Sequence, residues 1–117
     1  MSASAAQAAA FYREAMREGA VWGVRDETGF AAPLTGDGVR AMPFWSLRSR
    51  AEKVIQNVPA YAGFTVAKIP LTEWRERWLP GMIDDGLFVG INWSGEHATG
   101  HDVQPAEAEA ALAATEP

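Results

Sequence analysis

Cysteine is absent from the 117-residue chain, and histidine is rare, with two copies. The absence of cysteine excludes disulfide bonds, thiol nucleophiles and cysteine-ligated zinc or iron–sulfur sites. Long hydrophobic runs are also missing: the longest uncharged stretch, 54–67, is too short for a membrane helix and contains Pro59 and Gly63. No glycine cluster matches a phosphate-binding loop or a dinucleotide fingerprint. We therefore expect no metal, no cofactor and no membrane partner.

Positive charge is in the minority, with 10 Lys and Arg residues against 15 Asp and Glu and a net charge of −5. Non-specific binding to nucleic acid needs clustered positive charge, so we expect no nucleic-acid partner. The charge is uneven, because residues 1–70 carry 8 basic and 6 acidic groups whereas residues 71–117 carry 2 and 9. The first residues show no basic segment followed by an apolar run, so a cytoplasmic location is expected. The expected oligomeric state is a monomer or a weak homodimer.

Apolar residues make up 48% of the chain and charged residues 21%, a balance typical of a globular domain. Apolar residues at helical spacing predict four helices: between Ser4 and Gly19, over 47–56, from a cap at Thr72 to a break or restart at Pro80, and from Pro105 onward. Strand-like segments separated by turn signals predict strands over 20–25, 30–34, 39–45, 64–69, 87–93 and 98–103.

The arrangement of these strands follows from their patterns and connections. The segment 87–93 is apolar on both faces, which predicts a strand in the middle of a sheet. Short turns join the first three strands and predict an antiparallel meander. The sequence thus predicts an α+β fold, a mostly antiparallel five- or six-stranded sheet with three or four helices packed on it. We expect one compact domain over residues 4–114, with frayed termini at 1–3 and 115–117.

Several short blocks of the sequence resemble one bacterial family. They are Phe11-Tyr12, Val21-Trp22, Asp26-Glu27-Thr28-Gly29-Phe30, Met42-Pro43-Phe44-Trp45-Ser46, Ile69-Pro70-Leu71, Arg77-Trp78-Leu79-Pro80-Gly81-Met82 and Asp85-Gly86-Leu87. Over about residues 8–105 the chain resembles the proteins grouped as domain of unknown function 2750. The resemblance supports the fold and the domain limits. It implies no catalytic residue and leaves the function open.

Residue types that carry catalytic or metal chemistry are sparse. His97 and His101 lie in a segment expected to be a strand, where about 13 Å would separate them, too far to bind one ion directly. Asp84 and Asp85 precede Gly86 and are typical of a polar turn. We therefore assign no catalytic residue and no metal ligand.

The five tryptophans are the most distinctive feature of the composition. Trp45 and Trp93 end expected strands, where side chains often reach a rim, and tryptophan is enriched among residues that dominate binding. Ser46 is expected to cap the helix over 47–56, whose first turns carry positive charge that suits a carboxylate or phosphate. The candidate partner- or ligand-binding residues are therefore Trp45, Ser46, Arg48, Arg50 and Trp93.

Two classes of function remain open. The lack of a credible acid–base pair, nucleophile or metal set favours a non-enzymatic protein-interaction or regulatory module, similar to an immunity or adaptor protein, that binds through the aromatic rim. The alternative is a small-molecule binding domain or an enzyme, with a pocket for an anionic ligand at the start of the second helix.

Overall fold

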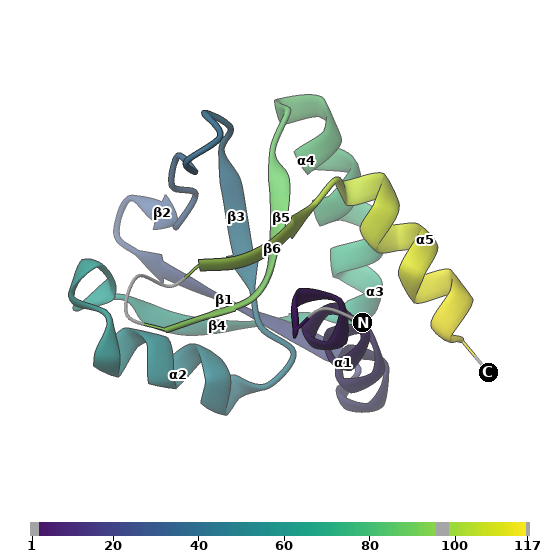
Figure 1. Cartoon of the computed structure of the whole chain (residues 1–117), viewed down its shortest axis with the longest axis horizontal. Helices are drawn as coiled ribbons and strands as arrows, with labels where there is room; N and C mark the ends of the chain where they lie inside the picture. Colours follow the sequence, from purple (N-terminus) through teal and green to yellow (C-terminus); the bar gives the residue numbers. More distant parts are fainter. Residues whose placement is uncertain (1–2, 96–98, 117) are drawn as a thin grey trace.

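The computed structural model describes residues 3–95 and 99–116. Helices and strands alternate along the chain (Figure 1). The helical elements are α1 (Ala3–Glu18), α2 (Arg48–Asn57), the 3₁₀ turn η1 (Pro59–Tyr61), α3 (Leu71–Glu73), the π-helical segment η2 (Trp74–Trp78), α4 (Leu79–Asp85) and α5 (Pro105–Thr115). The strands are β1 (Ala20–Asp26), β2 (Gly29–Phe30), β3 (Ala41–Phe44), β4 (Thr65–Pro70), β5 (Phe88–Ser94) and β6 (Thr99–Val103). The fold is α+β, as expected. The fraying expected at residues 1–3 and 115–117 falls partly outside the described residues.

The strands form two three-stranded sheets, which corrects the expected single sheet of five or six strands. One sheet is antiparallel, in the order β2-β1-β4, and the other is mixed, in the order β3-β5-β6. The meander expected from the first three strands is wrong, because β3 pairs in parallel with β5 and not with β2. The reason is burial: β3 is apolar on both faces and needs a neighbour that is also covered on both sides. β5 is that neighbour, and its central place in its sheet is confirmed.

A β-bridge between Trp22 and Trp45 joins the two sheets. The backbone N–H groups of Trp22 and Trp45 each donate to the other residue's carbonyl oxygen at 2.8 Å. Trp22 lies in β1 of the first sheet, and Trp45 follows β3 of the second. The candidate binding residue Trp45 is therefore placed at the junction of the sheets, and the chain passes from it directly into the start of α2.

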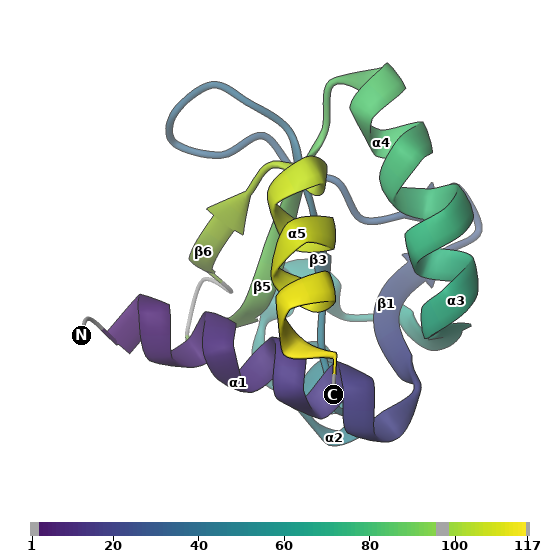
Figure 2. The same ribbon diagram turned by 90° about the vertical axis from the view of Figure 1, so that its right-hand side faces the viewer.

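The joined sheets separate two hydrophobic clusters. The larger cluster lies under α1, α4 and α5, and Figures 1 and 2 show these three helices around the strands, with α4 far from α2 in Figure 1. The smaller cluster lies under α2 and includes Trp22, Trp45, Val54 and Trp93. Residues of β1 alternate between the two, because successive side chains of a strand point to opposite faces. The side of the molecule under α2 is therefore a second, smaller core, in which three tryptophans are the largest side chains.

The chain is helical from Leu71 to Asp85, and of the two outcomes expected at Pro80, a break or a restart, the structure has the restart. Pro80 has no N–H to donate and its ring crowds the preceding turn. The five residues of η2 widen the helix before this point, and α4 restarts at Leu79 with Pro80 in its first turn. The cap expected at Thr72 is wrong, because the helix begins at Leu71, whose N–H donates to the Gly19 carbonyl oxygen at 2.9 Å. No helix in the described ranges is long and apolar enough to cross a membrane.

Candidate functional site

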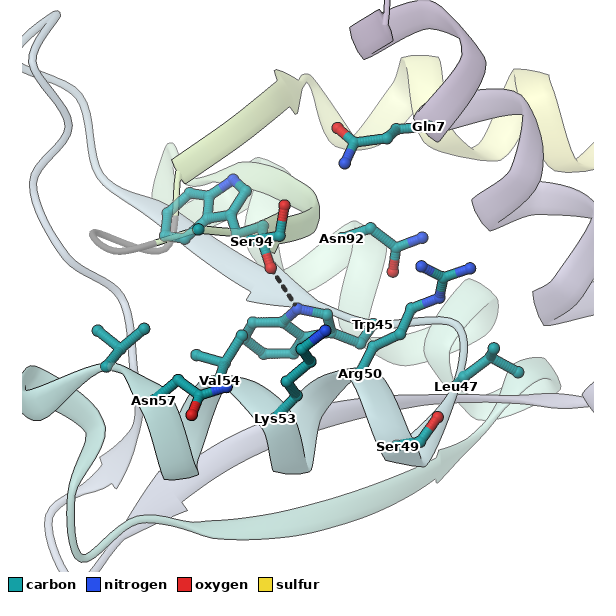
Figure 3. A pocket seen from close by; sticks show the side chains of 13 residues that line it. Gln7, Trp45, Leu47, Ser49, Arg50, Lys53, Val54, Asn57, Asn92 and Ser94 are labelled. Atoms are coloured by element: carbon teal, nitrogen blue, oxygen red, sulfur yellow. Dashed lines mark hydrogen bonds between the residues drawn. The ribbon is translucent and has the colours of Figure 1, made fainter.

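A cleft of about 660 Å³ opens between α2, the first half of α1 and the end of β5 (Figure 3). Apolar side chains form its floor, and polar side chains stand around it. The lining residues are Gln7, Trp45, Leu47, Ser49, Arg50, Lys53, Val54, Asn57, Val58, Asn92, Trp93, Ser94 and Gly95. Pockets for small ligands have about this volume and this mixture of an apolar floor and a few polar groups.

Two tryptophans of the floor are fixed by their indole groups. Trp45 Nε1 donates to the Trp93 carbonyl oxygen at 2.8 Å, the bond drawn in Figure 3, and Trp93 Nε1 donates to Asp102 Oδ1 at 2.8 Å. Burial raises the pKa of Asp102, although the hydrogen bond from Trp93 acts in the opposite direction. The expected exposed rim is wrong: Trp45 is 0% and Trp93 4% exposed. Both residues form a rigid floor and do not project as anchors for a protein surface.

An irregularity in β5 places Trp93 at the cleft. The register with β6 shifts between Ile91 and Ser94, so that two residues of β5 stand opposite Gly100. Without the shift, Trp93 would share a face with Ile91 and point into the larger cluster. With it, the Trp93 ring covers Gly90, three residues earlier, where a Cβ atom would lie 2.7 Å from its Cζ2. The bulge thus turns the tryptophan to the α2 side of the sheet.

Asn92 forms the bulge and is held in an unusual backbone conformation. Its φ is 46°, which makes it the one non-glycine residue with positive φ among the described residues. Asparagine tolerates this left-handed region better than other non-glycine residues. The Asn92 side chain is buried and binds Ser46 twice: Oδ1 accepts from the Ser46 N–H at 3.0 Å, and Nδ2 donates to Ser46 Oγ at 3.1 Å. A strained residue that persists beside a cleft marks a constrained site.

Ser46 links this asparagine to the charged groups of the site. Its hydroxyl donates to Glu14 Oε1 at 2.6 Å, and Arg50 Nη2 donates to Glu14 Oε2 at 3.0 Å. The helix-capping role expected for Ser46 is wrong, because Leu47 is the N-cap residue of α2 and no side chain caps it. A network of hydrogen bonds therefore runs from Asn92 through Ser46 and Glu14 to Arg50, and connects β5, α1 and α2.

The environment of Glu14 keeps it ionised. Burial by itself would raise the pKa of Glu14, but the hydrogen bonds from Ser46 and Arg50 and the positive charges of Arg50 and Arg17 outweigh it and lower the pKa below its usual value. Glu14 therefore carries a full negative charge near neutral pH.

The structure separates the two arginines that the sequence grouped together. Arg50 lines the cleft, whereas Arg48 is exposed outside it and donates to Glu52 Oε1 at 3.2 Å, one turn along α2. Lys53, one turn after Arg50, also lines the cleft and forms no ion pair within the described ranges. Of the five candidate residues, Trp45, Arg50 and Trp93 line the cleft, Ser46 lies directly behind it, and Arg48 does not belong to it.

Sequence reasoning missed Gln7, Glu14, Asn57 and Asn92. The i, i+3 and i, i+7 spacing of Arg50, Lys53 and Asn57 would have placed these three polar side chains on one face of α2. No sequence signal indicates that Glu14 on α1 reaches this face, or that Asn92 leaves the regular strand.

The described lining residues supply hydrogen-bond donors and positive charge and contain no carboxylate or imidazole. Such a set suits a ligand with acceptor oxygens or a negative charge. His101 lies on β6, and His97 lies outside the described residues, so the expected distance between the two histidines stays a prediction. Over the described ranges, no group of three His, Asp or Glu side chains is placed to hold a metal ion.

Comparison with known proteins adds a family assignment. A comparison with curated proteins gives no match. A family model described as "Protein of unknown function (DUF2750)" matches residues 8–112, nearly the whole chain, including α2, β5 and thus most of the cleft. This chain therefore belongs to the DUF2750 family.

Proposed function

We propose that this protein is a binding module for a small organic acid, a molecule with a compact apolar body and an acidic group, held in the cleft between α1 and α2. The observation that carries the proposal is the pairing of a buried tryptophan floor with cationic and amide side chains around a volume of about 660 Å³. The apolar body would lie against Leu47, Val54 and Trp93, with the fully buried Trp45 behind them. The acidic group would face Lys53 and Arg50.

The function that the sequence favoured is instead a non-enzymatic protein-interaction or regulatory module that binds through an aromatic rim. Tryptophans that dominate protein interfaces bury a large exposed surface against the partner. Trp45 and Trp93 have almost no exposed surface to donate, and a cleft with a fixed floor is better suited to a small molecule. The local positive charge in a chain of net charge −5 also favours an anion in this place.

The experiment compares three probes that share one ring: phenylacetate, phenyl phosphate and benzyl alcohol. We expect at least one of the two acids to quench or shift the tryptophan fluorescence at low millimolar concentration, and benzyl alcohol to bind more weakly than that acid. Lys53→Gln should weaken acid binding by about tenfold, the size of one charge-assisted hydrogen bond. Lys68→Gln is the matched control, because Lys68 is exposed on β4 outside the cleft. Equal binding of acids and alcohol, or equal loss in both lysine variants, would contradict the proposal.

The cytoplasmic location and the absence of a nucleic-acid partner, both expected from the sequence, remain part of this proposal. Fractionation of cells that produce the protein tests the location. Sedimentation at several concentrations tests whether the chain is a monomer or a weak homodimer.

A further inference from the structure

The two cations of the cleft are not equivalent. Arg50 donates to Glu14 at 3.0 Å, and in Figure 3 its guanidinium group is turned toward α1. Lys53 has no carboxylate partner within the described ranges, and Figure 3 shows its amine on the side of Trp45. A ligand in the cleft therefore meets one cation that is already paired and one that is available.

Glu14 is a fixed part of this arrangement. Its side chain is 17% exposed, against 42% for Arg50, and both of its oxygens accept hydrogen bonds. One of the donors, Ser46, is itself held by Asn92. Glu14 thus cannot turn away from Arg50 without breaking a network that joins three elements. The fixed charges of Arg50, Lys53 and Glu14 leave the cleft with one net positive charge.

On the basis of the proposed function, we infer that the cleft selects a monocarboxylate over a doubly charged phosphate monoester, and that Glu14 determines this specificity. A single negative charge is balanced by Lys53. A second negative charge finds no unpaired cation among the described lining residues and is repelled by Glu14 behind Arg50. Attraction to the cations and repulsion from Glu14 both double for the dianion, but the cost of removing an ion from water rises with the square of its charge. The attraction left after the Glu14 charge is subtracted therefore compensates the desolvation of a monoanion better than that of a dianion.

The inference is tested by the ratio of the dissociation constants for phenyl phosphate and phenylacetate at about pH 7.5, where the phosphate monoester is a dianion. In the unmodified protein we expect phenylacetate to bind more tightly. Glu14→Gln keeps an oxygen that accepts from Ser46 but removes the charge, so the ratio should shift about fivefold toward phenyl phosphate. Glu52→Gln is the matched control: it removes the same charge from α2 outside the cleft, and the ratio should not change.

A second measurement needs no variant. Phenyl phosphate becomes a monoanion as the pH falls through about 6, while the lowered pKa of Glu14 keeps that carboxylate ionised. We expect phenyl phosphate to bind the unmodified protein more tightly at about pH 5 than at about pH 7.5. Tighter binding of phenyl phosphate than of phenylacetate at the higher pH, or an unchanged ratio in Glu14→Gln, would overturn the inference and leave the proposed function standing. Failure of both acids to bind in preference to benzyl alcohol would overturn the proposed function itself.

Discussion

At the scale of single residues, Asn92 has the largest influence on the shape of the cleft. Its left-handed backbone produces the bulge that turns Trp93 to the α2 side, and its buried amide holds Ser46. The backbone strain of Asn92 and its buried side-chain hydrogen bond affect the stability of the protein separately, and different substitutions remove each of them.

Asn92→Ala should destabilise the protein by about 2–3 kcal/mol, because it leaves the buried Ser46 N–H without its acceptor and keeps a Cβ atom at a positive φ. Asn92→Gly loses the same hydrogen bond but adopts this φ freely, so it should be less destabilising by about 1 kcal/mol. Urea unfolding of the three proteins measures both differences. Equal destabilisation in the alanine and glycine variants would show that the backbone of Asn92 is not strained.

The pH dependence of stability reports on Glu14. A carboxylate whose pKa is lowered by folding stabilises the protein above its unfolded pKa, about 4.3. That stabilisation is lost as the pH falls through the lower folded pKa. The difference in unfolding free energy between the unmodified protein and Glu14→Gln should therefore be largest near neutral pH and shrink below about pH 4. The other carboxylates contribute equally to the unfolding free energy of both proteins, so their contributions cancel in the difference. A difference that stays constant from neutral to acidic pH would contradict the ionised, paired state of Glu14.

The sequence could identify part of the candidate site but not its geometry. Trp45, Arg50 and Trp93 were expected to share one site, and all three line the cleft. Their exposure could not be predicted, because the end of a strand does not reveal which element covers it. Here α2 covers Trp45, and the bulge at Asn92 buries Trp93. Ser46 precedes a helix as a capping residue does, but its hydroxyl has stronger partners in a distant carboxylate and amide.

At the scale of elements, β5 combines the two features that build the floor of the cleft. It is central in its sheet, and its bulge lets Trp93 lie over Gly90 on the same face. The absence of a side chain at Gly90 is what gives the indole its place. An atom added at Gly90 would therefore displace Trp93 from the floor of the cleft.

Gly90→Ala should destabilise the protein by about 1–3 kcal/mol, since the new methyl group would overlap the buried Trp93 ring. Gly81→Ala is the control within α4, where nothing lies within 4 Å of an added Cβ atom, and it should stabilise the protein by about 0.5–1 kcal/mol. Thermal or urea unfolding distinguishes the two. A Gly90→Ala protein as stable as the unmodified one would mean that the indole does not pack on this glycine.

Most elements could be predicted from the sequence, whereas their pairing could not. The helix between Ser4 and Gly19, the central strand at 87–93 and its partner toward Val103 are confirmed, because periodicity and turn residues are local signals. The parallel pairing of β3 with β5 depends on burial of both faces by distant helices, which no local signal encodes. The π-helical segment before Pro80 likewise reflects packing, since it lets Trp74 stay fully buried while Trp78 packs against Phe30 and Phe44.

At the scale of the whole molecule, two cores share the joined sheets, and the cleft belongs to the smaller one. The larger core contains Trp74 and packs under α1, α4 and α5, where Arg75 also pairs with Glu109 of α5. The smaller core contains Trp45 and Trp93 under α2. The tryptophans are therefore divided between the two sides of the sheets, and each indole N–H reports on its own side.

The most direct test of the proposed binding site is a titration with phenylacetate followed by the indole N–H signals in a ¹H–¹⁵N NMR spectrum. We expect the Trp45 and Trp93 signals to shift in a saturable way, because both indoles form the floor of the cleft. The Trp74 and Trp78 signals, on the far side of the sheets, should stay in place. The same titration of Lys53→Gln should give no saturable shift in this range. Saturable shifts at Trp74 or Trp78 with none at Trp45 and Trp93, or no shifts at all, would contradict a ligand site between α1 and α2.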